Sequence, residues 1–160
     1  MKKKSKQNLA IYIIAGVIII AVVGYYYTSD QARIRGYTFG NELQQIQEDL
    51  KKLQVDFDTQ IGMWHDKTIT KEDFLRYSDG HITDMENLYK RYNDLLVPVP
   101  FVSSVELFKL STDAQIKSDK ELILWIQTND TSHKIRSDQL LQDAFDYEAS
   151  ALGKFNEAKK

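Results

Sequence analysis

Apolar residues recur every three or four positions through most of this 160-residue chain, which is the spacing of amphipathic helices. Four short segments interrupt the rhythm: GYTFG at 36–40, DKTIT at 66–70, VPVPF at 97–101 and TNDTS at 128–132. Strict alternation of apolar and polar residues never persists, and the β-branched residues sit at helical spacing. The pattern therefore predicts an all-α protein.

The segments between the interruptions predict four helices, at about 30–65, 70–96, 103–128 and 132–158. Short links between helices of similar length favour antiparallel neighbours, so we expect an antiparallel up-down four-helix bundle. The alternative is a homodimer, because the apolar stripe of the first helix is narrow enough for a parallel coiled coil. That stripe comprises Phe39, Leu43, Ile46, Leu50, Leu53, Phe57, Ile61 and Trp64.

Capping patterns mark the starts of two helices. Thr70 with Asp73 three residues later predicts an N-cap for the second helix. The prolines of VPVPF end that helix, because proline lacks a backbone N–H and disfavours the helical conformation of its predecessor. Ser103 and Glu106 have the spacing of a capping box at the start of the third helix.

An apolar segment precedes the first helix. A basic stub at 1–8 is followed by LAIYIIAGVIIIAVVGYYY at 9–27, which carries no charge. A helix of this length measures about 28 Å at 1.5 Å per residue, close to the hydrocarbon thickness of a bilayer. Tyr25, Tyr26 and Tyr27 at its end are typical of the aromatic belt at a membrane interface. We therefore predict a single transmembrane anchor.

The alternative to an anchor is a signal peptide cleaved after Gly24. The apolar segment is longer than the roughly 7–15 residues usual in signal peptides, which favours retention. The positive-inside rule then places the stub in the cytoplasm and residues 28–160 outside the cell membrane.

The charge distribution excludes one class of partner. The first eight residues carry four lysines, which leaves 17 basic and 23 acidic residues beyond them, a formal charge of −6. A body this acidic is not expected to bind nucleic acid. The chain has no Cys, which excludes disulfides and thiolate chemistry.

No pattern of catalytic or metal-binding residues is present. The sequence lacks G-x-S-x-G, H-E-x-x-H and glycine-rich phosphate loops, so we expect no enzyme and no cofactor. His65, His81 and His133 fall at well-separated positions of the predicted bundle, so we expect no metal site. NDT at Asn129 matches an N-glycosylation sequon in a predicted loop, and the same residues also suit a simple turn.

The third predicted helix carries apolar residues on a second face. Leu107, Leu110, Ala114 and Trp125 lie opposite its main apolar face. They form either a docking surface for another protein or the sign of a helix enclosed by its neighbours.

Two polar residues fall within apolar faces. His81 lies in the apolar arc of the second helix, and Asp119 lies in that of the third. A hairpin folded about VPVPF sets position 81 level with about position 118, so we expect a buried His81–Asp119 pair. The pair would fix packing or, alternatively, sense pH, because histidine titrates near neutrality.

These features favour a membrane-anchored helical subunit that interacts with the lipid bilayer and with other membrane proteins as an accessory to a complex. The alternative function is an extracytoplasmic ligand-binding or sensing bundle, which needs a partner to carry its signal because no output domain follows the helices.

Overall fold

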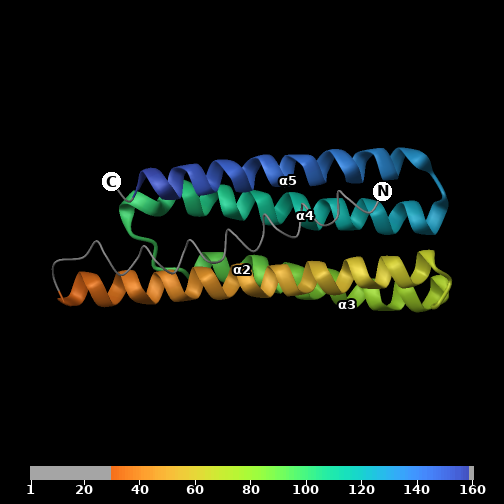
Figure 1. Ribbon diagram of the computed structural model, residues 1–160, viewed down its shortest axis with the longest axis horizontal. Coiled ribbons are helices and arrows are strands. Elements are labelled where there is room, and N and C mark those ends of the chain that lie inside the picture. The colour runs from red at the N-terminus through yellow and green to blue at the C-terminus, as the bar shows by residue number, and fades with distance from the viewer. Residues whose placement is uncertain (1–29, 159–160) are drawn as a thin grey trace.

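Four long helices make up most of the described part of the protein (Figure 1). The computed structural model describes residues 30–158, with side chains from Arg35 onward. The helices are α2 (Asp30–His65), α3 (Lys71–Arg91), α4 (Val102–Thr128) and α5 (Thr131–Glu157), and no strand occurs among residues 30–158. The all-α prediction and its four helices are confirmed.

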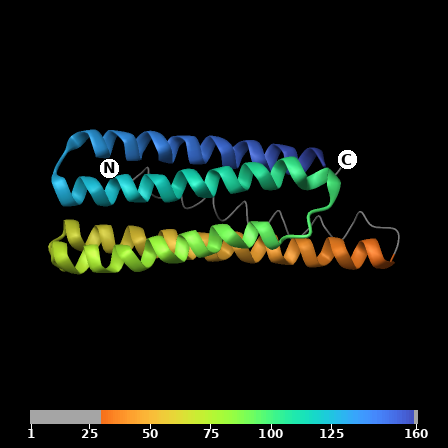
Figure 2. The same cartoon turned by 180° about the vertical axis from the view of Figure 1, so that it is seen from behind.

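The helices form two antiparallel hairpins that lie side by side (Figures 1 and 2). One hairpin is α2 with α3, and the other is α4 with α5. The link between the hairpins lies at the end of the molecule where α2 begins and the described chain ends.

The predicted stub at 1–8, the anchor at 9–27 with its three tyrosines, and the alternative cleavage site near Gly24 lie outside the described residues. Within residues 30–158, none of the helices has the length and apolar character needed to cross a bilayer.

Local chemistry explains most helix ends. Thr70 is the N-cap of α3, as predicted, and its hydroxyl accepts a hydrogen bond from the Asp73 N–H at 3.1 Å. Asn129 ends α4 in the left-handed conformation (φ 59°), and its N–H donates to the Trp125 carbonyl. Asp130 then caps α5 by accepting from the Ser132 N–H at 2.9 Å.

The link between the hairpins differs from the prediction. α3 ends at Arg91 rather than near 96 and is followed by a 3₁₀ turn, η1 (Tyr92–Asp94). Leu95 is already extended, so Leu96 leaves the apolar face and is 75% exposed.

The predicted capping box at Ser103 and Glu106 is wrong. A second 3₁₀ turn, η2 (Val99–Phe101), leads directly into α4 at Val102. The Val102 N–H donates to the Val99 carbonyl, so backbone groups of the preceding turn occupy the place of a side-chain cap.

The apolar core falls into two clusters. The larger surrounds Phe39, Leu43, Ile46 and other apolar residues at the end where α2 begins, and the smaller surrounds Phe57, Phe74 and Ile126 near the opposite end. The stripe of the first helix thus packs within the bundle of one chain. The homodimer stays a prediction.

Small residues at seven-residue intervals join α4 to α5. α4 contributes Ser104, Ser111 and Ser118, and α5 contributes Ser137, Ala144 and Ala151, all buried. The Ser118 hydroxyl donates to the Ser137 carbonyl at 2.8 Å, which fixes the register. Equal steps in opposite directions then set Ser111 level with Ala144 and Ser104 level with Ala151. Such short side chains let two backbones approach closely.

Enlarging this interface should separate the two helices. We expect Ala144→Leu to lower the free energy of unfolding by about 2–3 kcal/mol, because the added carbons have no space between the backbones. Ala149→Leu is the matched control on the exposed side of α5 and should change it by less than about 0.5 kcal/mol. Urea denaturation followed by circular dichroism measures both values. Equal effects would show that α5 does not rest on α4 through this stripe.

Candidate functional site

A buried polar contact lies between the two apolar clusters. His81 Nε2 stands 2.9 Å from Asp119 Oδ2, and the two residues are 3% and 6% exposed. The structure therefore brings together the two residues that the hairpin register pairs. The His81 ring stacks on Phe57 with centroids 4.1 Å apart, which fixes the orientation of the imidazole.

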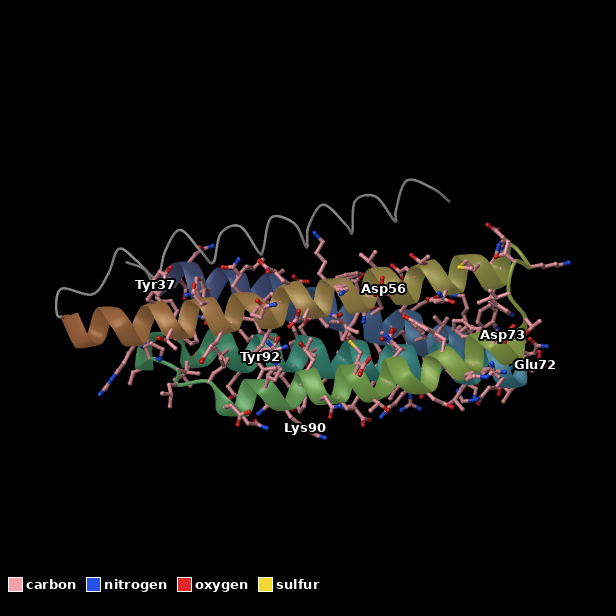
Figure 3. All side chains as sticks on the ribbon, turned by 90° about the horizontal axis from the view of Figure 1, so that it is seen from below. Tyr37, Asp56, Glu72, Asp73, Lys90 and Tyr92 are labelled. Atoms are coloured by element: carbon pink, nitrogen blue, oxygen red, sulfur yellow. The ribbon has the colours of Figure 1, made fainter. Side chains whose placement is uncertain are left out.

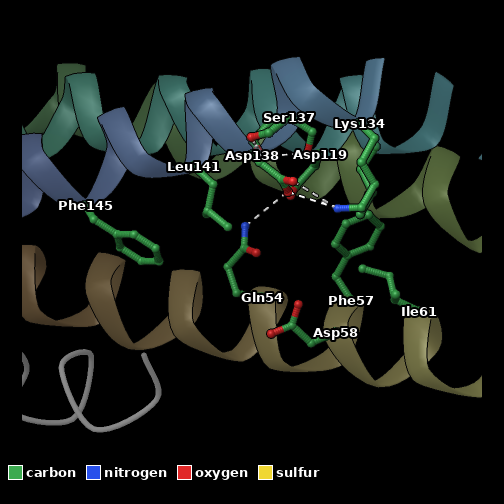
Figure 4. Close-up of a pocket in the computed structure, with 12 residues that line it drawn as sticks. Gln54, Phe57, Asp58, Ile61, Asp119, Lys134, Ser137, Asp138, Leu141 and Phe145 are labelled. Carbon is green, nitrogen blue, oxygen red and sulfur yellow. Dashed lines mark hydrogen bonds and ion pairs between the residues drawn. The ribbon is translucent and has the colours of Figure 1, made fainter. Parts of the chain in front are cut away.

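Gln54 of α2 completes this contact and was missed from the sequence. Its Nε2 donates to the same Asp119 oxygen at 3.0 Å (Figure 4). Gln54 lies four residues after Leu50 and three before Phe57, so a polar residue within the apolar stripe was the available signal. Burial raises the pKa of Asp119, while the hydrogen bonds from His81 and Gln54 oppose that rise.

A pocket of about 260 Å³ opens beside this contact, between α2, α4 and α5. Figure 4 shows side chains from both α2 and α5 pointing into it. The polar lining residues are Gln54, Asp58, Ser118, Asp119, Lys134, Ser137 and Asp138. The apolar lining residues are Phe57, Ile61, Leu122, Leu141 and Phe145. The pocket thus combines five apolar lining residues with seven polar ones.

The two charged residues that α5 contributes form a pair with each other. Lys134 Nζ donates to both carboxylate oxygens of Asp138, at 3.0 and 3.2 Å. The same ammonium lies 5.5 Å from the centroid of the Trp125 ring, a cation–π contact. The charge of Lys134 is therefore already balanced by groups of its own neighbourhood.

Asp58 has no such balance. Asp58 lines the α2 side of the pocket, and within residues 35–158 no hydrogen bond or ion pair reaches its carboxylate. Surrounding protein atoms raise the pKa of Asp58 to about 6; the charge of Asp119 adds to the rise and His81 opposes it.

The predicted docking face on α4 is largely occupied by the bundle itself. Leu107 packs against the larger cluster, Trp125 packs against the smaller one, and Ala114 is buried. The Trp125 ring meets Trp64 edge-on with centroids 5.9 Å apart. Leu110, 44% exposed, is the member of this set that faces solvent. The second apolar face arises because α4 has helices on more than one side.

Asn129 lies in the exposed turn between α4 and α5. Its left-handed backbone conformation is one that asparagine tolerates well, so the turn itself accounts for this residue type. Its use as a glycosylation site stays a prediction.

A second polar layer crosses the bundle nearer the end where α2 begins. Tyr92, which points inward between the helices, accepts a hydrogen bond from Gln47 at 2.8 Å and lies 3.0 Å from the Thr112 hydroxyl (Figure 3). Burial raises the pKa of Tyr92 above its usual range, so its hydroxyl stays protonated.

Glu148 of α5 is buried without a partner. It is 3% exposed, and neither carboxylate oxygen has a hydrogen bond among the described residues. Burial raises its pKa to about 7. Like Gln54, it interrupts an apolar face, since it lies four residues after Ala144 and three before Ala151.

The described residues hold no group of three or more His, Asp or Glu arranged to bind a metal ion. Comparisons of the chain with protein-family models, with curated proteins and with solved structures give no match. The function must therefore be argued from the chemistry of this site.

A double-mutant cycle should show strong coupling between His81 and Asp119. We expect His81→Leu and Asp119→Leu each to lower the free energy of unfolding by about 3 kcal/mol, because each leaves one buried polar partner unpaired. The double variant should lose far less than the two losses combined. The exposed pair Asp113–Lys117 serves as the control, with a coupling below about 0.5 kcal/mol. Additive losses at 81 and 119 would contradict the contact.

Glu148 should make the bundle less stable as the pH rises. The folded protein binds the Glu148 proton up to about pH 7, whereas the unfolded chain releases it near the ordinary glutamate pKa of 4.5. The neutral Glu148 carboxyl therefore contributes its full stabilisation below pH 4.5, and this contribution is lost as the pH rises through 7. The free energy of unfolding falls by about 3 kcal/mol as a result. Asp58 acts in the same direction up to about pH 6.

Glu148→Gln removes the titrating group and keeps the shape. We expect this variant to be more stable than the wild type at pH 8 and to show a flatter stability profile between pH 5 and 8. The exposed variant Glu106→Gln is the control and should keep the wild-type profile. Denaturation midpoints at each pH give the measurement, and a Glu148→Gln profile identical to the wild type would contradict the assignment.

Proposed function

We propose that this chain is a membrane-anchored, extracytoplasmic bundle that binds a small molecule in the pocket between α2, α4 and α5. The observation that carries the proposal is the pocket itself, in which apolar walls from Leu122, Leu141 and Phe145 face a polar floor of Gln54 and Asp119. Gaps between the helices of a bundle are a frequent place for ligand sites, and this composition is typical of them.

The packing of α5 supports a real opening at this place. Ser137 and Ala144 turn toward α4, so the α2 side of α5 depends on the larger residues Leu141 and Phe145. These two are only half-buried although they are among the largest apolar residues of α5. An occupant of the pocket would cover them, which is the usual source of binding free energy for small molecules.

The membrane attachment and the outer location rest on the sequence of residues 1–27, through the length of the apolar segment and its basic flank. A partner protein that responds to the bound ligand would join the two functions that the sequence left open.

A second candidate function is the accessory subunit, and one observation favours it. The link between the hairpins exposes Leu96, Val99 and Val102, of which Val99 is 87% exposed. The link lies at the end of the bundle where α2 begins (Figure 1), and the predicted anchor directly precedes α2 in the sequence. Purification in mild detergent followed by mass spectrometry distinguishes a stable membrane-protein partner from a bound small molecule.

Ligand binding can be tested with a library of small organic molecules on the full-length protein in detergent micelles. We expect some of them to shift the methyl NMR signals of Ile61, Leu122 and Leu141. Leu141→Trp fills the pocket and should abolish the shifts of the remaining signals. Ile135→Trp, on the exposed face of α5, should leave them unchanged. A library without any hit at these methyls, or hits that survive Leu141→Trp, would contradict the proposal.

A further inference from the structure

Five titratable groups from four helices border the pocket or its floor. They are Asp58 of α2, His81 of α3, Asp119 of α4, and Lys134 and Asp138 of α5. Lys134 balances Asp138, and His81 forms a hydrogen bond with Asp119. Ionised Asp58 is then the charge left over, so the pocket carries a net negative charge whichever protonation state His81 adopts.

We propose that the pocket selects small organic cations, in which a protonated amine meets Asp58 and a short apolar body lies between the walls. This inference rests on the proposed ligand-binding function and names its ligand class. An ammonium group would supply the hydrogen bonds and the opposite charge that Asp58 lacks among residues 35–158.

Asp119 adds a second acceptor for the same cation. His81 and Gln54 both use its Oδ2, and no hydrogen bond reaches its Oδ1 from the described residues. Asp119 lines the pocket, so its carboxylate belongs to the polar part of the pocket lining. An ammonium group has three N–H donors and can bind both carboxylates, whereas a ligand hydroxyl has one donor and can bind one of them.

The apolar lining residues determine which apolar group the ligand can carry. Phe145 of α5 presents an aromatic ring at the pocket, whereas Phe57 of α2 lines it from the core, 1% exposed and stacked on His81. Aromatic faces attract cations as well as apolar groups, so they fit an arylalkylamine better than an inorganic ion. A volume of about 260 Å³ restricts the occupant to one ring with a short side arm.

An anion is disfavoured by the same geometry. Lys134, the ammonium group of the lining, already donates to Asp138 and lies over Trp125. A carboxylate in the pocket would meet Asp58 without a free cation among the lining residues. Three probes of similar size then differ mainly in charge and should differ in affinity: benzylamine, benzyl alcohol and benzoate.

Binding should also depend on pH with a defined sign. A bound ammonium stabilises the charged form of Asp58, whose pKa lies near 6 in the empty pocket. Benzylamine stays protonated between pH 5 and 7, so its affinity should rise over this range as Asp58 loses its proton. A comparison of the wild type with Asp58→Asn isolates the contribution of Asp58, because both proteins keep His81, Asp119, Lys134 and Asp138.

The test is a calorimetric and NMR titration of the full-length protein in micelles with the three probes. We expect benzylamine to bind at least tenfold more tightly than benzyl alcohol, and benzoate to bind most weakly. Asp58→Asn should weaken benzylamine at least tenfold and flatten its pH dependence. Asp56→Asn, an exposed carboxylate two residues away on α2, is the matched control and should keep wild-type affinity.

The possible outcomes distinguish a failure of the cation selectivity from a failure of the proposed ligand binding. Equal binding of benzylamine and benzyl alcohol, or preference for benzoate, would overturn the cation selectivity and leave a ligand-binding pocket. Loss of affinity in Asp56→Asn as large as in Asp58→Asn would show a general charge effect and overturn the assignment to Asp58. Absence of any shift at the pocket methyls with all three probes, and with the wider library, would overturn both proposals.

Discussion

The rest of the bundle depends on the buried contact between His81 and Asp119. Neither residue can be buried alone at low cost, so the contact fixes how α3 lies along α4. Tyr92 with Thr112 and Glu86 with Lys120 follow the same antiparallel register. Sliding either helix by one turn would break these contacts together. A polar layer of this kind gives up some apolar burial and gains a unique alignment.

The alignment in turn creates the pocket. Gln54 must reach Asp119, so α2 presents polar side chains at the level where α5 presents Lys134 and Asp138. The apolar clusters end on either side of this level. The opening therefore lies where the core is interrupted, and its charge is a consequence of the residues that hold the helices in register.

The sequence predicted much of this because periodicity and hairpin geometry are local. The four helices, the cap at Thr70 and the meeting of His81 with Asp119 follow from spacing and one turn. Gln54 and Glu148 were missed, because a polar residue in an apolar stripe shows its role only when the facing helix is known. The 3₁₀ turns around Pro98 and the inward packing of Trp125 depend on the assembled hairpins, which no single segment encodes.

The serine and alanine stripe has a mechanical consequence. Two helices in close contact through short side chains have little freedom to slide, so α4 and α5 should move as one rigid body. The covalent joint between the hairpins is the short extended segment around Leu95 and Pro98. Rotation about that joint would change the space between α2 and α5 only by breaking the Gln54–Asp119 hydrogen bond, because that bond joins α2 to α4. α2 directly follows the predicted anchor in the sequence, so the proposed ligand site and the proposed membrane attachment share one helix.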